Sequence, residues 1–546
     1  MGNQKWAIRN GFKFSIDKTV CVRFYKSNHA KWEPGKEPQF KIGPNTIKCK
    51  EEAKFLGLIF DKNLSFRSHI KNLKKKCLKA LNLLKVVAHQ HWGADKDTVL
   101  MLYRALIRSK LDYGSVVYGS ARESYLKCLE PIQNQALRLA LGAFHTSPIP
   151  SLNALCSEPP LHIRRTKLSL SYSSKLLGHP ENPAYKHIFK TKYTKKSLGT
   201  ETEIKPISCR LSKHVTEGKI PFDDRNVKPR VDLDFPPWEI PPIYTDLDLS
   251  FLSKKSDSPS YMLNSFYEHR DSKYRNFNEI YTDGSKMGKK VGCAVVKRNR
   301  RPAQVRLADG SSIYSAELMA IKTAMQYAFL SRFQDHVIFT DSESAVKAFQ
   351  DPNFEHPYIA EAFNILHKHK QSNKTIALCW IPSHVGILGN EQADQEAKKA
   401  LCLTPTLKIP YTDIKPIITE YCKNLFQSRW SETCIKDNNK LYNILDDLKH
   451  MPSPIFQCRS DETAFYRCLI GHSKLTHKYI FERDRQPQCN VCRKVLSIKH
   501  IFECPVYSVQ RRTYLQNMTD IKSVFKNVQP MDIIKFLKNT DIFSQL

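Results

Sequence analysis

The sequence predicts a multidomain α/β protein in which residues 276–402 form a mixed five-stranded sheet with flanking helices. Three observations carry this prediction. The chain has 546 residues, which is too long for a single hydrophobic core. Strand-like and helix-like hydrophobic patterns alternate from residue 277 to residue 402, in the order β-β-β-α-β-α-β-α. Most of the remaining chain instead shows helical periods.

The net charge points to a polyanionic partner. The chain has 86 Lys and Arg residues against 53 Asp and Glu residues, a formal net charge of +33 that is spread along its length. Proteins with this balance commonly bind polyphosphates, because released counterions supply much of the affinity. The alternative is a solvated basic surface without a partner. We expect nucleic acid.

Cysteine usage and hydropathy indicate an intracellular, reducing compartment. The 16 Cys residues are mostly scattered, and the polar start at residues 1–6 has no apolar segment of a secretory signal behind it. No run of about 18 apolar residues exists, so no membrane span is expected. Basic clusters such as Lys74-Lys75-Lys76 are compatible with a nuclear location without specifying it.

The segments outside 276–402 differ in their patterns. Residues 1–66 read as strands and turns, because the stretches 12–16 and 55–60 alternate in hydropathy. Residues 67–190 read as a basic helical region. Its first helix has an apolar face formed by Ile70, Leu73, Cys77, Leu81, Leu84 and Val87. Residues 191–275, with repeated prolines, predict a linker that is partly extended and poorly ordered. Residues 403–546 return to helical patterns, interrupted by a Cys/His cluster.

Four acidic residues occur where predicted strands end or predicted helices begin. Asp283 and Asp341 each follow an apolar strand, and Glu317 and Asp394 lie near helix starts. Carboxylates gathered at one sheet edge repel one another, and divalent cations relieve that repulsion. Oxygen ligands favour Mg²⁺ or Mn²⁺, and two such ions about 3.5–4 Å apart can assist phosphodiester hydrolysis. Any single acid could instead be a helix cap, as Asp341 before Ser342 illustrates.

The motifs around these acids resemble those of type-1 ribonuclease H. They are YTDGS at 281–285, SAEL at 315–318, FTDSESA at 339–345 and IPSHVGILGNEQAD at 381–394. Each string alone would recur by chance, but four in the family's order within one α/β pattern are specific. The resemblance implies endonucleolytic hydrolysis of the RNA strand of RNA–DNA hybrids.

The resemblance also implies the metal ligands. Asp283 matches the acid that bridges two Mg²⁺ (or Mn²⁺) ions. Asp394 matches the acid that completes the site of the ion that activates water. Glu317 and Asp341 match the ligands of the second ion.

Further roles follow from the same resemblance. His384 matches a histidine that assists proton transfer or product release. Gly284 and Ser285 match the turn that approaches the RNA backbone, where a 2′-hydroxyl distinguishes RNA from DNA. Asn390 matches a substrate contact. The alternative is a correctly folded but inactive domain.

The first 190 residues resemble the end of the palm and the thumb of non-LTR retrotransposon reverse transcriptases. The resemblance rests on the basic helices and on Trp6, Ala7, Asn10, Gly11, Phe12, Lys18, Thr19, Phe24, Phe55, Leu56, Gly57, Leu58, Asp61, Leu64, His69 and Ile70. In that family this stretch follows an aromatic-X-Asp-Asp turn, which is absent here. Phe222-Asp223-Asp224 and Asp446-Asp447 are better explained as solvated acids. We therefore expect no complete reverse-transcriptase active site, as in a truncated or decayed element.

A Cys/His cluster near the C-terminus has the spacing of a tetrahedral zinc site. Cys489, Cys492, His500 and Cys504 follow the pattern C-x2-C-x7-H-x3-C. Its flanks resemble the C-terminal tail of the same retroelement family. Four protein ligands leave no open position, so a structural zinc ion is expected rather than a catalytic one. The alternative is four unligated side chains.

The sequence as a whole predicts a fragment of a retrotransposon polyprotein. Its parts would be a partial palm end (1–66), a thumb-like region (67–190), a linker (191–275), a ribonuclease H domain (276–402) and a helical tail with a zinc knuckle (403–546). Basic flanks would hold nucleic acid by phosphate contacts. The alternatives are a non-catalytic nucleic-acid-binding remnant, a cellular hybrid-removing nuclease, and a subunit that scaffolds a polymerase supplied in trans. The oligomeric state is not specified.

Overall fold

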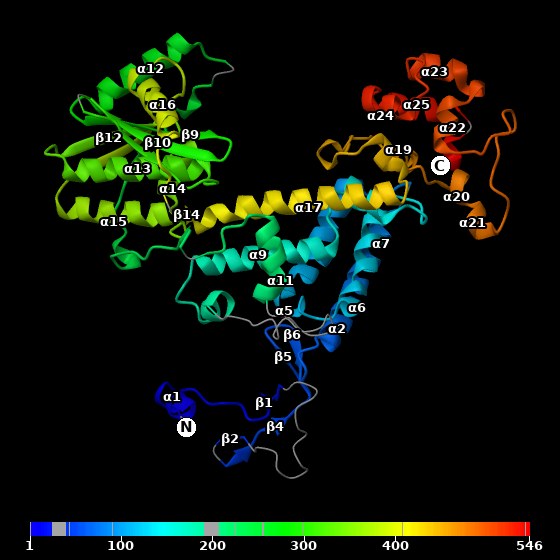
Figure 1. Ribbon diagram of the computed structural model, residues 1–546, viewed down its shortest axis with the longest axis horizontal. Coiled ribbons are helices and arrows are strands. Elements are labelled where there is room, and N and C mark those ends of the chain that lie inside the picture. The colour runs from blue at the N-terminus through cyan, green and yellow to red at the C-terminus, as the bar shows by residue number, and fades with distance from the viewer. Residues whose placement is uncertain are drawn as a thin grey trace. The chain divides into compact units, whose positions relative to one another are not determined.

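Figure 1 shows the computed structural model, which describes residues 2–24, 40–42, 44–89, 91–190, 207–223, 225–253, 256–298, 300–406, 408–540 and 542–546. The chain divides into two compact units. The helical unit comprises Met1–Ser169, Thr194–Ile207 and Cys422–Leu546, and the sheet unit comprises Leu170–Tyr193 and Ser208–Tyr421. Within the described residues, no helix combines the length and the apolar character needed to cross a bilayer.

The sheet unit is built around a six-stranded sheet with the order β11-β10-β9-β12-β13-β8. Its strands are β8 (Tyr244–Asp246), β9 (Asn278–Met287), β10 (Lys290–Lys297), β11 (Ala303–Arg306), β12 (Asp335–Thr340) and β13 (Thr375–Trp380). β9, β10 and β11 are antiparallel neighbours. β12, β13 and β8 continue the sheet from β9 in parallel.

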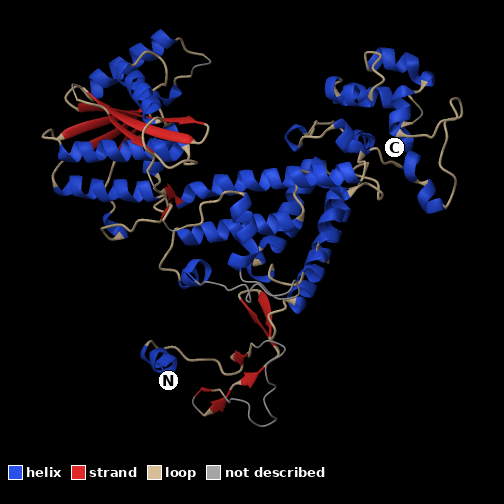
Figure 2. Ribbon diagram, in the orientation of Figure 1, coloured by secondary structure: helices blue, strands red, loops and turns tan. Residues whose placement is uncertain are grey.

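Helices cover both faces of this sheet (Figures 1 and 2). They are α12 (Pro259–Lys273), α13 (Ile313–Leu330), α14 (Glu343–Gln350), α15 (Pro357–Gln371) and α16 (Leu388–Ala400). α13, α14 and α15 bury apolar side chains in one core together with Ile280 and Ile338 of the sheet. α12 and α16 contribute to a second core around Phe339. The alternation of strands and helices expected for residues 276–402 is therefore present.

The sheet has one strand more than the five that the sequence predicted. The sixth, β8, comes from the segment predicted to be a linker, and its three residues are too few to give a detectable period. β8 exists through its pairing with β13. The same segment also forms α11 (Ile207–Glu217), β7 (Val227–Lys228) and α12. The linker prediction is therefore wrong for these residues, whereas residues 191–206 lie outside the described part of the chain.

The helical unit has a core that joins residues from both ends of the sequence. The N-terminal part supplies α2 (Arg67–Val87), α3 (Lys96–Tyr103) and α7 (Glu130–Leu141). The C-terminal part supplies α19 (Arg459–Ile470), α22 (Ile498–Glu503) and α25 (Pro530–Lys538). Arg459 donates hydrogen bonds to the carbonyl oxygens of Leu139 and Ala140 at the end of α7, both at 2.8 Å. The two parts therefore stabilise each other.

The other helices and strand pairs complete the described part of the chain. The remaining helices are α1 (Gly2–Arg9), α4 (Ser109–Asp112), α5 (Ser115–Tyr118), α6 (Glu123–Lys127), α8 (Ile149–Leu155), α9 (Leu161–Leu177), α10 (Pro183–Tyr185), α17 (Ile414–Lys436), α18 (Lys440–Ile444), α20 (Lys474–His477), α21 (Tyr479–Glu482), α23 (Ser508–Tyr514) and α24 (Ile521–Asn527). Small two-stranded pairs form from β1 (Val20–Cys21) and β4 (Lys48–Cys49), β2 (Lys41–Ile42) and β3 (Asn45–Thr46), β5 (Glu52–Phe55) and β6 (Leu58–Asp61), and β7 and β14 (Ile409–Pro410).

Two expectations for the N-terminal region have different outcomes. The apolar face of α2 is buried at all the expected positions except Val87, which is 39% exposed. The strand expected at residues 12–16 is not formed, and Phe12 is 64% exposed. Alternation alone is a weak signal there, because no described strand pairs with this stretch to satisfy its backbone groups.

Candidate active site

Three acidic side chains meet at the centre of the sheet unit. Asp283 lies on β9, and Asp341 directly follows β12. The parallel register pairs Thr340 with Thr282, so each acid is the next residue along its strand. Glu317 lies in the second turn of α13. Carboxylate oxygens of the three residues lie within 4.8 Å of one another. The register of two adjacent parallel strands therefore brings Asp283 and Asp341 together. The sequence predicted that β9 would end at Asp283 and turn at Gly284 and Ser285. Instead β9 continues through these residues to Met287, because they pair with Cys293 and Gly292 of β10.

Burial and the repulsion of neighbouring charges make the carboxyl groups of Asp283 and Glu317 hard to ionise. Asp283 and Glu317 are each only 7% exposed. Burial, followed by the charges of Asp341 and Asp394, raises the pKa of Asp283 to about 7. Burial and the charges of Asp283 and Asp341 raise the pKa of Glu317 well above its usual range. A positive charge placed among them would favour the ionised forms.

The residues present fit a divalent cation. Oε2 of Glu317 is buried and has no hydrogen-bond partner, while the backbone N–H of Gly284 donates to the same carboxylate. A Cβ at Gly284 would lie 3.0 Å from Oε1 of Glu317 and 3.1 Å from Cβ of Ala316, so only glycine leaves this space open. An oxygen-only donor set with an unpartnered oxygen suits Mg²⁺ or Mn²⁺.

Asp394 belongs to a neighbouring group. Its carboxylate lies with side chains of His384 and Glu391, the candidate ligand atoms being within 4.8 Å of one another. Oδ2 of Asp394 accepts a hydrogen bond from Nζ of Lys398 at 2.6 Å. His384 is exposed and has a φ of 55°, in the left-handed region. Sequence reasoning missed Glu391, although its spacing of three residues before Asp394 places both on one face of α16.

One buried and one half-buried side chain, Asn390 and Trp380, hold Asp341 in place. Asn390 is 2% exposed, and its Nδ2 donates to Oδ2 of Asp341 at 3.3 Å. Nε1 of Trp380 donates to the backbone oxygen of Asp341 at 3.0 Å. The sequence singled out Asn390 for a substrate contact, which stays a prediction, and it did not single out Trp380. Gly284 and Ser285 follow Asp283 on β9 and are half-exposed.

A third polar cluster in the sheet unit is not suited to a metal. Asp246, His269 and Cys379 lie close together. However, Oδ2 of Asp246 already accepts hydrogen bonds from Nε2 of His269 (2.8 Å), Nζ of Lys273 (3.2 Å) and the hydroxyl of Tyr274 (2.7 Å). The lysine and the two other donors occupy this carboxylate oxygen. The cluster therefore anchors β8 to α12.

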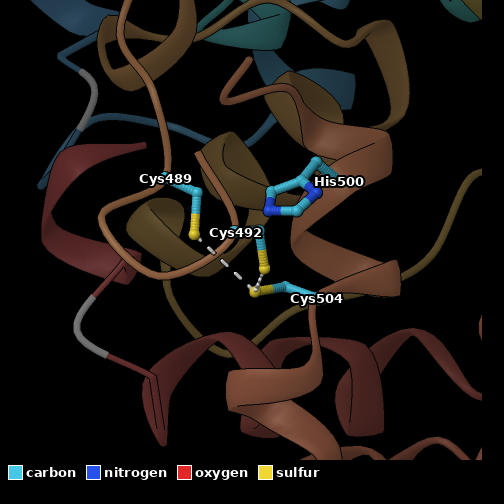
Figure 3. Close-up of side chains that lie close together, drawn as sticks. All are labelled: Cys489, Cys492, His500 and Cys504. Atoms are coloured by element: carbon cyan, nitrogen blue, oxygen red, sulfur yellow. Dashed lines mark hydrogen bonds between the residues drawn. The ribbon is translucent and has the colours of Figure 1, made fainter. Parts of the chain in front are cut away.

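The predicted zinc ligands converge in the helical unit, as Figure 3 shows. Cys489 and Cys492 lie before α22, His500 lies on it, and Cys504 follows its end. The Sγ atom of Cys504 lies 3.8 Å from that of Cys489 and 3.6 Å from that of Cys492. Nε2 of His500 is buried without a hydrogen-bond partner.

The electrostatics at this cluster favour a thiolate. The backbone N–H of Cys492 and the side chain of His500 lower the pKa of Cys489 to about 6. The neighbouring thiol of Cys504 contributes most to raising the pKa of Cys492 to about 11. A metal ion would compensate the second and third thiolates, so three sulfurs and one imidazole nitrogen fit Zn²⁺.

Comparisons with known proteins agree with this geometry. Residues 275–402 match the RNase H family. The chain is 27% identical over 168 residues to a retrovirus-related Pol polyprotein from the type-1 retrotransposable element R1 of Bradysia coprophila, covering 30% of this chain and 16% of that protein. It is 23% identical over 181 residues to the RNA-directed DNA polymerase from mobile element jockey of Drosophila funebris, covering 33% of this chain and 19% of the relative.

A third relative is also a protein of a mobile element. The probable RNA-directed DNA polymerase from transposon X-element of Drosophila melanogaster is 28% identical over 145 residues, which is 26% of this chain and 14% of that protein. In each of these three comparisons the match spans less than a fifth of the relative's length. The similarity to non-LTR retrotransposon polyproteins is therefore distant.

Proposed function

We propose that residues 275–402 hydrolyse the RNA strand of RNA–DNA hybrids. The premise is that these residues are an RNase H domain, in a protein distantly similar to non-LTR retrotransposon reverse-transcriptase polyproteins. The observation that carries the proposal is the meeting of the Asp283, Glu317 and Asp341 carboxylates within 4.8 Å. Hydrolysis within the RNA strand would leave 3′-hydroxyl and 5′-phosphate ends.

The acidic residues would hold two Mg²⁺ or Mn²⁺ ions. Asp283 would contribute to both sites, Glu317 and Asp341 to one, and Asp394 to the other. When bound, such ions supply activation of the attacking water and stabilisation of the leaving oxygen in an in-line displacement. The raised pKa of Asp283 supports this assignment, because it shows that the ionised carboxylates lack a compensating positive charge. A bound cation would supply that charge and stabilise the ionised forms.

Other residues of the domain would position the substrate and move protons. His384 is exposed beside Asp394, where its imidazole can accept or deliver a proton as the product leaves. Gly284 and Ser285 lie beside Asp283, where a 2′-hydroxyl of the RNA strand can be recognised. Asn390 would keep the Asp341 carboxylate turned toward the cluster through its hydrogen bond.

The test is cleavage of a labelled hybrid by the full chain and by Asp283→Asn. Loss of metal-dependent cutting in the variant, with hybrid binding retained, would support the proposal. A wild-type chain that binds the hybrid and never cuts it would refute it.

A second candidate function is nucleic-acid binding without catalysis. It is favoured by the exposed lysines Lys71, Lys75 and Lys79, which their spacing of four residues places on one face of α2. In this reading residues 1–66 and 67–190 would be a palm end and a thumb that grip nucleic acid, and the acidic cluster would be idle. Binding that is unaffected by Asp283→Asn, together with absent cleavage, would favour it.

We further propose that Cys489, Cys492, His500 and Cys504 hold one structural Zn²⁺ ion. The buried, unpartnered Nε2 of His500 and the short distances between the sulfur atoms support this assignment. Because Ile501 and Phe502 of the same helix are buried in the core of the helical unit, the ion would stabilise that unit. Metal analysis of the purified chain tests this directly.

A further inference from the structure

A buried carboxylate outside the RNase H match contacts the start of the helix that carries Glu317. Asp413 lies beyond residues 275–402 and is 4% exposed. Its Oδ2 accepts a hydrogen bond from the backbone N–H of Ser312 at 2.9 Å, and its Oδ1 accepts one from the Ser312 hydroxyl at 2.8 Å. Ser312 is the N-cap of α13 and accepts a hydrogen bond from the N–H of Ser315 at 3.0 Å. Asp413 therefore holds the residue that begins this helix.

The contact continues into a second helix start. Oγ of Ser315 lies 3.0 Å from Nε2 of His356, and both residues are buried. His356 is itself the N-cap of α15, where its Nδ1 accepts the N–H of Tyr358 at 3.3 Å. Because Nδ1 is an acceptor, Nε2 carries the proton and donates to Ser315. The first turns of α13 and α15 and the side chain of Asp413 thus form one hydrogen-bonded network.

Asp413 is fixed independently of α13. Its segment begins with β14, which pairs in parallel with β7, and the N–H of Ile409 donates to the carbonyl oxygen of Asn226 at 2.9 Å. Both β7 and β14 lie outside residues 275–402, on opposite sides of that region in the sequence. The pairing of these two flanking strands therefore fixes the segment that places the Asp413 carboxylate at the start of α13.

The contact of Asp413 with the start of α13 affects the acidic cluster because Glu317 lies on the same helix. Glu317 is five residues after Ser312, about 7.5 Å along the helix axis. The first turn of a helix lacks internal partners for its N–H groups and frays unless it is capped. Oε2 of Glu317 has no hydrogen-bond partner of its own, so the position of this carboxylate depends on its helix and on Gly284.

We propose that Asp413 is a positioning residue for the metal site, which fixes the first turn of α13 and thereby holds Glu317 against Asp283 and Asp341. The inference rests on the proposed function of this cluster and extends it beyond the RNase H match. A purely structural role for Asp413 would lower the stability of the sheet unit without changing its affinity for metal.

The experiment measures Mn²⁺ binding to the full chain by titration calorimetry, with thermal unfolding of each variant measured in parallel. Asp413→Ala should raise the dissociation constant for Mn²⁺ by up to about tenfold. This is the low end of the effect of losing a side chain that bonds a metal ligand directly, because Asp413 acts on Glu317 through Ser312 and the first turn of α13. Asp413→Asn should have a smaller effect in the same direction, since its amide oxygen still accepts one hydrogen bond. If the alanine variant fails to fold, the asparagine variant alone tests the positioning role.

Asp246→Asn is the matched control. Asp246 is also a buried, hydrogen-bonded carboxylate of the sheet unit, but its partners His269 and Tyr274 lie on α12 and directly after its end. This variant should lower the unfolding temperature and leave Mn²⁺ binding unchanged.

The outcomes separate the two proposals. If Asp283→Asn abolishes Mn²⁺ binding while both Asp413 variants bind like the wild type, the positioning role is overturned and the proposed function stands. If Asp283→Asn binds Mn²⁺ like the wild type, the metal site itself is overturned, and the role of Asp413 with it.

Discussion

Replacing Asp283 by Asn should stabilise the metal-free protein at alkaline pH. The pKa of Asp283 is about 7 in the fold and 3.8 in its ordinary state. A raised carboxyl pKa means that ionisation disfavours the fold, so the destabilisation grows as pH rises from about 4 to about 7 and stays constant above. The difference corresponds to about 4 kcal/mol, which Asn avoids because it stays neutral. The gain should fall to a small remainder near pH 4, because at that pH the aspartate is protonated in the fold and already partly protonated in the unfolded chain.

The assay is differential scanning calorimetry of the two proteins in EDTA at pH 8 and pH 4. For a unit of this size the gain at pH 8 amounts to roughly 10 °C in the unfolding temperature of the sheet unit. Adding Mg²⁺ should stabilise the wild type and leave Asp283→Asn unchanged, because only the native wild-type cluster binds the ion. A variant less stable than the wild type in EDTA at pH 8 would refute the argument, since it would mean that the fold favours the ionised carboxylate.

Three further perturbations test separate parts of the account. Gly284→Ala places a Cβ 3.0 Å from Oε1 of Glu317 and should slow cleavage roughly tenfold with the fold retained; an unchanged rate would contradict the steric argument. Cys504→Ser should release one zinc per chain and lower the unfolding temperature of the helical unit by roughly 5 °C or more, with cleavage preserved. Replacing Lys71, Lys75 and Lys79 by Ala should weaken hybrid binding and reduce its logarithmic salt slope by roughly 2–3; an unchanged slope would exclude phosphate contacts at α2.

The acidic cluster could be predicted because each acid sits at a position with simple geometry. Asp283 and Asp341 are consecutive with paired residues of parallel strands, and apolar runs in the sequence mark both strands. Glu317 lies in the second turn of α13. Asp394 was expected near a helix start as well, but it lies in the middle of α16 and groups with His384 and Glu391. The predicted zinc ligands likewise converge, because short spacings in a sequence constrain distances in space.

Residues that depend on contacts between distant segments could not be predicted. β8 has three residues between proline-rich stretches, and only its pairing with β13 makes it a strand. Asp413 has no local signal, because its partner Ser312 is about a hundred residues earlier in the chain. Arg459 similarly joins the end of α7 across more than half of the sequence. Sequence periodicity describes each element but does not say which distant element it meets.

Cleavage of a hybrid with separately labelled strands tests the central claim most directly. The full chain would be incubated with a duplex of one RNA and one DNA strand, in Mg²⁺ or Mn²⁺, beside Asp283→Asn and an EDTA control. The account predicts fragments of the RNA strand alone, with 3′-hydroxyl and 5′-phosphate ends, that disappear with EDTA and in the variant. Intact RNA in a complex with the folded chain, or equal cutting of the DNA strand, would contradict it.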